Sequence, residues 1–353
     1  MKTKTKNMTI KELFQIAIKQ KASDLHLVAD MPPILRIDGN IAPIKGLDIV
    51  IDNTVLTKMV NSILDAEQKK KFKEECGLDM GYSLDGKSRF RINIHHERGN
   101  VGLVARVIKD QIPTLEELEL GKNVSDILNA HQGLILVTGP TGCGKSSTLA
   151  AMINHINTNR NTNIITLEDP IEFLFQSKKS IIIQRQLGSD MVSFQKGLKH
   201  VLRQDPDVIM VGEMRDLETI ASVVTLAETG HLVLATLHTY SASQTIDRII
   251  DIFPSHQQNQ IRMQLSMIMK AIISQKLIPR SPKGRIATRE VLINNAAVAN
   301  LIRENKINLI KTTIETSSKQ GMISHDQDLR RLYQQKLITK EVAQTYISDP
   351  SLL

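Results

Sequence analysis

Short apolar runs recur through the second half of the chain, and helical patterns separate them. Four of these runs lie at 134–137, 164–167, 208–211 and 232–235. Strands that are apolar on both faces and alternate with helices are typical of a parallel sheet covered by helices on both sides. The pattern therefore predicts an α/β domain with a parallel-rich sheet over residues 123–353.

The first hundred residues follow a different pattern, in which strand-like and helix-like segments are mixed. A helix is predicted first, capped by Thr9 and with an apolar face that consists of Ile10, Leu13, Phe14 and Ala17. Strand-like segments follow at 25–28, 34–37, 89–94 and 102–107. A helix-like stretch at 54–73 lies among them. We expect a smaller α+β domain over residues 1–109 and a polar linker at 110–122.

Beyond the last of the four apolar runs, the chain is predicted to form one hairpin and then helices. The segments 274–278 and 285–292 flank a turn that contains proline and glycine. Ser324 and Gln327 form a capping-box pattern at the start of the last long amphipathic stretch. The C-terminal region is therefore expected to be helical.

The composition excludes several classes of protein. Aromatic residues make up only 3% of the 353 residues, so a core must rest on Ile, Leu, Val and Met. No run of 18 or more apolar residues occurs, which predicts that no helix spans a membrane, and we expect a cytoplasmic protein. The two cysteines, Cys76 and Cys143, are too few for a disulfide framework or a four-cysteine zinc site.

The formal net charge of +8 is compatible with three kinds of partner. Nucleic acid, an anionic membrane face and nucleotide phosphates all attract a basic protein, and net charge does not choose among them. We interpret the basic tail with Lys2, Lys4 and Lys6 as a solvated surface.

A phosphate-binding motif begins directly after the first apolar run. Residues 139–146 satisfy the pattern G-x-x-x-x-G-K-S, and a helix-prone stretch follows at 147–156. In such a loop, backbone N–H groups curl around phosphate, Lys145 neutralises the β- and γ-phosphates, and the Ser146 hydroxyl ligates Mg²⁺. We therefore predict ATP and Mg²⁺ as ligands, with nucleotide contacts from Gly139, Pro140, Thr141, Gly142, Cys143, Gly144, Lys145, Ser146 and Ser147.

The thiol of Cys143 lies inside this motif. Its backbone N–H belongs to an anion-attracting loop, and Lys145 is close in sequence. Both features predict a lowered thiol pKa and a reactive thiol. The alternative is a small residue that is buried and inert.

Acidic residues follow two other apolar runs. Glu213 comes soon after the run at 208–211, where a carboxylate at the edge of a neighbouring parallel strand is able to hold Mg²⁺. Glu168 and Asp169 follow the run at 164–167, and a glutamate there is able to orient the attacking water. Each acid alone is equally consistent with a solvated loop position. The phosphate motif favours catalysis.

Two histidines, His231 and His238, bracket the run at 232–235. Their spacing places them on opposite faces of a straight strand or at its two ends, which argues against joint metal chelation. Contact with the γ-phosphate and a purely structural role are equally good interpretations.

Several motifs together resemble the ATPases of the secretion superfamily. They are the phosphate motif at 139–146, Leu-Glu-Asp-Pro-Ile-Glu at 167–172, Arg-Gln-Asp-Pro-Asp at 203–207, Val-Gly-Glu-Met-Arg-Asp at 211–216 and Glu-Thr-Gly-His at 228–231. Within that superfamily the chain is most similar to the PilT-type pilus retraction ATPases, especially at 214–220. It lacks the four-cysteine zinc motif that is usual in pilus extension and type II secretion relatives.

This resemblance implies a PAS-like N-terminal domain, a RecA-like C-terminal domain with the phosphate loop, and a ring of six subunits with ATP at the domain interface. It implies that one glutamate activates water, that another is the Walker B acid, that two histidines sense phosphate and that three arginines reach the nucleotide. These residues are Glu168, Glu213, His231, His238, Arg91, Arg98 and Arg106. Ordinary surface charge is the alternative for the arginines.

The function implied by the resemblance is a hexameric motor that powers pilus retraction by driving pilin disassembly. Its implied partners are further copies of itself, an inner-membrane platform protein and a second retraction ATPase. No nucleic acid is expected, and the implied location is cytoplasmic, peripheral at the inner membrane. The alternatives are a related ATPase of a type IV or type II-like secretion system, a RecA-like nucleic-acid motor, and a regulatory subunit that binds ATP poorly.

Two positions depart from the pattern of the family. Lys199 lies where relatives usually have arginine. The C-terminal retraction motif Ala-Ile-Arg-Asn-Leu-Ile-Arg appears at 297–303 with Ala299 in place of its first arginine. The second departure bears on coupling to retraction and leaves the ATPase prediction untouched.

Overall fold

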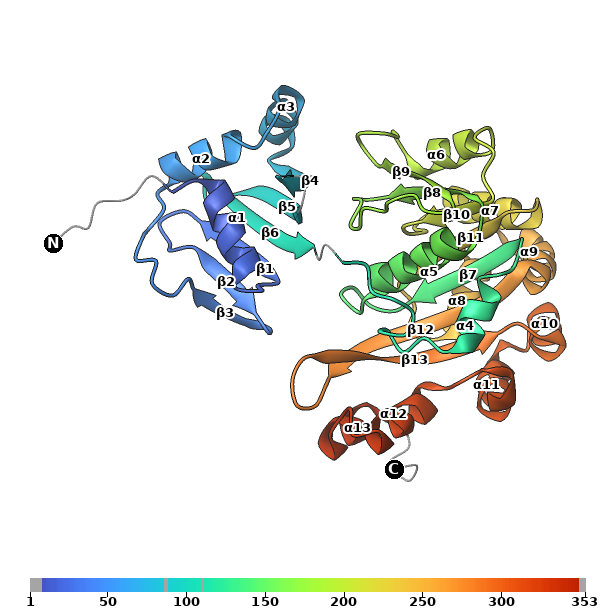
Figure 1. Ribbon diagram of the computed structural model, residues 1–353. Helices are drawn as coiled ribbons and strands as arrows, with labels where there is room; N and C mark the ends of the chain where they lie inside the picture. The colour runs from blue at the N-terminus through green and yellow to red at the C-terminus, as the bar shows by residue number, and fades with distance from the viewer. Residues whose placement is uncertain (1–7, 86–87, 109–110, 349–353) are drawn as a thin grey trace. The chain divides into compact units, whose positions relative to one another are not determined.

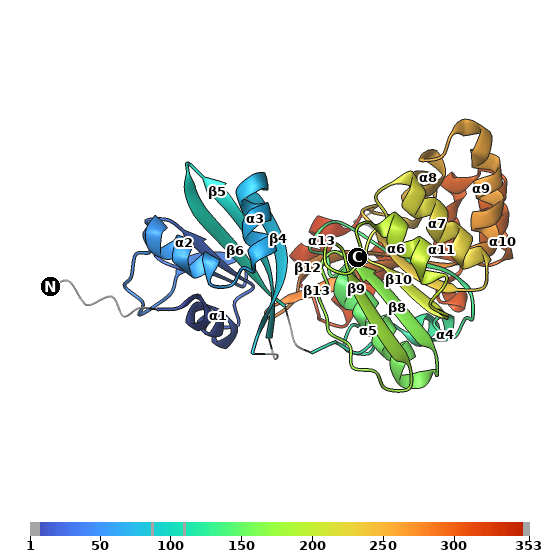
Figure 2. The same ribbon diagram turned by 90° about the horizontal axis from the view of Figure 1, so that it is seen from above.

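The computed structural model describes residues 8–85, 88–108 and 111–348 (Figures 1 and 2). The basic tail, residue 109 of the expected first domain and residue 110 of the expected linker lie outside these ranges. The chain divides near residue 111 into two compact units.

The first unit is built on an antiparallel sheet of six strands, and helices cover one of its faces. In spatial order the strands are β3 (Asn40–Pro43), β2 (Ile34–Ile37), β1 (Asp24–Val28), β6 (Asn100–Ile108), β5 (Ser88–Glu97) and β4 (Gly77–Leu84). The helices are α1 (Ile10–Lys19), α2 (Asn53–Asn61) and α3 (Ala66–Glu75). Phe14 of α1 stacks on Phe90 of β5, with ring centroids 4.4 Å apart. The predicted α+β unit is present.

The predicted helix at 54–73 is two helices. Asp65 caps α3 through its side chain, which accepts a hydrogen bond from the Gln68 backbone, and Gln68 bonds back to the Asp65 backbone. This capping box starts a new helix where the pattern of apolar residues suggested a continuous one. Strands β3 and β4 were not predicted, because β3 is fully exposed and β4 carries polar residues and glycines.

The second unit contains a seven-stranded sheet that is parallel except at one edge. Its order is β13 (Arg285–Ile293), β12 (Met269–Pro279), β7 (Gly133–Thr138), β11 (Leu232–Leu237), β10 (Val208–Val211), β8 (Asn163–Glu168) and β9 (Ile181–Gln186). All four predicted apolar runs are strands of this sheet. The predicted hairpin is the antiparallel pair β12–β13. Only β13 runs against its neighbour.

Helices cover both faces of this sheet (Figure 2). One core contains residues of α4 (Lys122–Ile127) and α5 (Lys145–Asn159). The other contains residues of α6 (Phe194–Val201), α7 (Leu217–Glu228), α8 (Ala242–Asp251), α9 (Ser255–Ile268), α10 (Ala296–Arg303) and α11 (Ile310–Thr316). In the described ranges, no helix has both the length and the apolar character that crossing a membrane requires.

The last helices, α12 (His325–Gln334) and α13 (Lys340–Tyr346), pack on the β12–β13 hairpin around a small apolar cluster of their own. The predicted capping box at the start of α12 is confirmed, because the Ser324 and Gln327 side chains each bond the other's backbone. Two short 3-10 helices, Ile307–Leu309 and Ser318–Gln320, connect the C-terminal elements.

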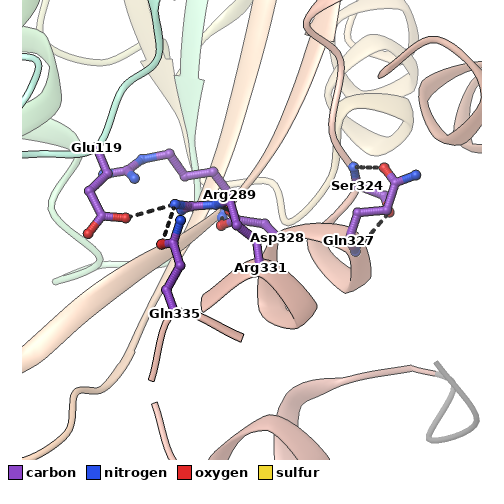
Figure 3. A network of polar contacts seen from close by, with 7 residues as sticks. All are labelled: Glu119, Arg289, Ser324, Gln327, Asp328, Arg331 and Gln335. Atoms are coloured by element: carbon purple, nitrogen blue, oxygen red, sulfur yellow. Dashed lines mark hydrogen bonds and ion pairs between the residues drawn. The ribbon is translucent and has the colours of Figure 1, made fainter. Parts of the chain in front are cut away.

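The segment from residue 112 onward is not the polar linker that the sequence suggested. Leu115 and Leu120 are buried in the core of the second unit. Glu119 accepts a hydrogen bond from Arg331 of α12 at 3.0 Å, as Figure 3 shows. The charged residues between the two leucines obscured the apolar contacts, since only the folded chain shows which side each residue faces.

Arg331 is the centre of a polar network that fixes α12. Its Nε donates to Asp328 Oδ1 at 2.8 Å, and its Nη1 also donates to Gln335 at 3.1 Å (Figure 3). The other oxygen of Asp328 accepts the backbone N–H of Arg289 in β13 at 2.8 Å. The network therefore joins α12 to the hairpin and to the segment before α4.

Candidate active site

The phosphate loop connects the end of β7 to the start of α5, as the motif predicts. The Lys145 ammonium donates to the backbone carbonyls of Gly139 at 2.7 Å and Pro140 at 3.1 Å, so the loop curls around its own lysine. Gly139 has a φ of 140°, and a Cβ there would lie 2.2 Å from the Gln275 carbonyl oxygen. Only glycine fits at that position. The curled backbone and the central ammonium suit a phosphate group.

The buried thiol of Cys143 contradicts the predicted reactivity. Its residue is 3% exposed, and burial raises the pKa of the thiol, although Lys145 acts in the opposite direction. Removing a thiolate from water destabilises the charged form more than the nearby ammonium stabilises it. The prediction of a lowered pKa is therefore wrong, and the alternative of a small, buried residue fits the structure.

Glu168 is the last residue of β8 and lies at the carboxyl edge of the sheet. Its side chain is buried, and its Oε1 accepts hydrogen bonds from Thr166 Oγ1 at 2.6 Å and Gln184 Nε2 at 3.1 Å. Thr166 is two residues away on the same face of β8, and Gln184 lies on the adjacent strand β9. The two donors hold the carboxylate in one orientation.

Glu213 lies two residues beyond the end of β10, at the same edge of the sheet. One carboxylate oxygen pairs with Arg215, and the other lies 3.3 Å from His238 Nε2. His238 follows β11 directly. The sequence pattern predicted that the strand of Glu213 is a neighbour of β7, but β11 lies between the two strands. That places β10 about 10 Å from β7, a span that the long glutamate side chain helps to cover.

His231 lies at the opposite end of β11 from His238. Its Nδ1 donates to the Leu226 carbonyl at 3.0 Å, and its own carbonyl accepts the N–H of Gly133, the first residue of β7. The six residues of β11 span about 20 Å. Of the two arrangements that the spacing allowed, opposite faces of the strand or its two ends, the histidines therefore lie at the two ends. A contact of His231 with the phosphate bound by its own chain is excluded by this distance.

The three candidate arginines of the first unit are not all together. Arg91 and Arg106 are directly opposite each other on β5 and β6. Arg106 Nε donates to Asp24 Oδ1 at 2.9 Å, which fixes its direction. Arg98 lies in the turn after β5, with its side chain 89% exposed and 3.7 Å from Glu97. The six strand residues 92–97, which span about 20 Å, separate it from Arg91.

The sequence matches the family described as type II/IV secretion system protein over residues 2–347. The chain belongs to this family. It is 42% identical over 343 residues to the type IV pilus retraction ATPase PilT of Pseudomonas aeruginosa, a match that covers 97% of this chain and 99% of the relative. It is also 42% identical over 336 residues to a twitching motility protein of Neisseria gonorrhoeae, covering 95% of this chain and 88% of that protein.

A solved structure is similar over the same extent. The crystal structure of the pilus retraction motor PilT with bound ADP has a TM-score of 0.90 and 44% sequence identity, and the match covers 98% of this chain and 99% of that one. The predicted fold class and the assignment to the PilT type are confirmed, and the chain is an ATPase of this family.

Three residues of the site were not predicted from the sequence. Thr166 and Gln184 orient Glu168, and Gln275 of β12 contacts the phosphate loop. Thr166 carried a weak signal, because it interrupts an otherwise apolar run two residues before the glutamate. Gln184 and Gln275 carried none, since strand neighbours far apart in the chain are known only from the folded sheet.

Proposed function

We propose that the chain is a homohexameric motor whose ATP hydrolysis drives the retraction of type IV pili. The observation that supports this most is the preformed phosphate loop, with two glutamates at the same edge of the sheet. The similarity to PilT supports the retraction role. The proposed location is the cytoplasmic face of the inner membrane, with a platform protein as partner.

Each residue of the site has a distinct proposed role. Lys145 and the backbone N–H groups of the loop bind the phosphates, and Ser146 and Glu213 would hold Mg²⁺, which supplies charge neutralisation when it is bound. Glu168 accepts a proton from the attacking water and orients it, because Thr166 and Gln184 keep its carboxylate fixed. We propose that His238, which contacts Glu213, responds to the phosphate.

The arginines of the first unit are proposed to act on the nucleotide of a neighbouring subunit. A guanidinium stabilises negative charge that develops on the transferred phosphate. Asp24 directs Arg106, and Arg91 lies opposite it on the next strand, so the two present their charges together. Arg98 lies apart from them, and its place in this role rests on the family resemblance alone.

The basic test compares hydrolysis and binding in purified full-length variants. We expect Lys145→Ala to abolish hydrolysis and Glu168→Gln to lower it at least about 100-fold while ATP still binds. Glu341→Gln, the same acid-to-amide change on α13, should keep the rate of the wild type. Wild-type turnover in a Glu168→Gln hexamer would remove that residue from its role.

Mixed rings test action between subunits. Arg106→Ala and Glu168→Gln subunits, each inactive alone, should recover part of the activity when they co-assemble, because some interfaces then contain all groups. Co-assembly without any recovery would place the arginine and its nucleotide in one chain.

The biological output is tested in the source organism. Loss of the gene should abolish pilus retraction and leave secretion intact; the reverse result would assign the chain to a secretion system. Hydrolysis that DNA stimulates, with a steep dependence on salt, would instead identify a nucleic-acid motor.

A further inference from the structure

Strand β12 runs beside the phosphate loop as well as beside β7. Its Ser274 is the register partner of Thr138, the last residue of β7, and the two hydroxyls hydrogen-bond at 2.9 Å. The next residue, Gln275, therefore lies level with the start of the loop. Its side chain is buried, with the whole residue 1% exposed, although it is polar. A buried amide of this kind must have hydrogen-bond partners.

Both ends of the Gln275 amide are used, and both partners belong to the phosphate-binding motif or the helix after it. Nε2 donates to the Cys143 carbonyl at 2.9 Å, and Oε1 accepts from Thr148 Oγ1 at 3.0 Å. Only this orientation of the amide satisfies both contacts, since a carbonyl oxygen cannot donate. The backbone carbonyl of Gln275 packs against Gly139, at the position where a Cβ would lie 2.2 Å away.

One residue thus touches the beginning of the loop, its fifth residue and the first turn of α5. We propose that Gln275 is a positioning residue that holds the phosphate loop in its binding shape before nucleotide arrives, and so sets the affinity for nucleotide. The inference rests on the proposed function, because it takes this loop to be the phosphate site. A loop that is already ordered binds more tightly, since the cost of ordering it does not fall on the binding step.

The loop contains its own reporter of this role. Cys143 is buried while Gln275 holds its carbonyl, and the other cysteine, Cys76, is exposed. In a Cys76→Ser background, Cys143 is the single thiol of the chain. If Gln275 holds the loop closed, loss of its side-chain hydrogen bonds exposes this thiol to a reagent such as dithiobis(nitrobenzoate).

The experiment uses the full-length protein with Gln275→Met, which keeps the length of the side chain and removes both hydrogen bonds, and Gln275→Glu, which loses the donor to Cys143. The control is Ser274→Ala, which removes a buried hydrogen bond of the neighbouring residue that does not touch the loop. Three quantities are measured: the Kd of a fluorescent ADP carrying a methylanthraniloyl group, the KM and kcat of hydrolysis, and the rate of the Cys143 thiol reaction.

We expect both Gln275 variants to raise the Kd for ADP at least about tenfold, because a buried carbonyl loses its donor. KM should rise with it, kcat should change much less, and the thiol should react at least about tenfold faster. Ser274→Ala should stay within about twofold of the wild type in Kd and in the rate of the thiol reaction, since the hydrogen bond that it removes joins two strands and does not involve the loop. A KM effect without a matching kcat effect separates positioning from general damage.

The inference is overturned if Gln275→Met binds ADP as the wild type does and its thiol stays as slow. If the Gln275 variants do not fold, Thr148→Val removes the other partner of the amide and must show the same faster thiol reaction. A wild type that bound no ADP would refute the proposed function instead, and the thiol rate would still decide whether Gln275 holds the loop.

Discussion

His325, the first residue of α12, is expected to lower the unfolding free energy of the protein as the pH falls. Both of its ring nitrogens are shielded from solvent and neither makes an ordinary hydrogen bond in the described ranges. The pKa of the imidazole is lowered to about 4, mainly by burial and also by the charge of Lys276, while the Tyr240 backbone and Asp326 act in the opposite direction. The ordinary value of 6.5 applies in the unfolded chain.

The direction of the pH dependence follows from which state of the chain, folded or unfolded, binds the proton. Between pH 6.5 and about 4, the unfolded chain takes up a proton on His325 that the folded chain refuses. Folding is therefore opposed as the pH falls through this window, and no such loss occurs above pH 6.5. The two pKa values correspond to a loss of about 1.4 kcal/mol at pH 5.5 and about 2.5 kcal/mol at pH 4.5, as upper limits.

The assay is urea unfolding of wild type and His325→Phe at pH 7.5, 5.5 and 4.5. Phenylalanine keeps a ring in the buried site and cannot take up a proton. The difference in unfolding free energy between the two proteins should change by about 2 kcal/mol in favour of the variant from pH 7.5 to 4.5. His131→Phe, which replaces an exposed histidine, is the control and should follow the wild type.

Equal pH dependence in wild type and His325→Phe would refute the reasoning. An NMR titration of the folded protein in which the His325 ring protonated above pH 6 would refute it independently. A confirmed result would mean that the folded chain is most stable when the buried ring of His325, the first residue of α12, carries no charge.

Two further changes test the packing around the site. Gly139→Ala should lower the unfolding free energy by about 2–5 kcal/mol in urea denaturation, because its Cβ would overlap the Gln275 carbonyl and its φ is unfavourable. Gly142→Ala, which has open space around it, should cost about 1 kcal/mol, and equal effects would contradict the overlap. Arg331→Ala should lower the unfolding free energy by about 2–4 kcal/mol, because buried Asp328 loses its ion pair. Glu119→Gln, which changes the more exposed partner of Arg331, should lower it by less than about 1 kcal/mol. A larger effect of Glu119→Gln than of Arg331→Ala would contradict this account of the network.

Local patterns in the sequence determined much of the architecture. The four apolar runs became strands of one sheet, and the phosphate motif became a loop between β7 and α5. The capping pairs Thr9–Glu12 and Ser324–Gln327 start helices where they stand. Each of these features depends on residues within a few positions of one another, so neighbouring chemistry is sufficient to specify it.

The tertiary structure decided everything that depends on burial or on distant neighbours. The sequence places Cys143 near Lys145, but only the fold shows that desolvation outweighs that charge. Gln275 bonds a carbonyl 132 positions away in the chain, which no local pattern reveals. His231 and Arg98 match the family motif and yet lie far from His238 and Arg91 within the chain. Strand order and strand length determine those distances, and neither quantity follows from the spacing of residues along the sequence.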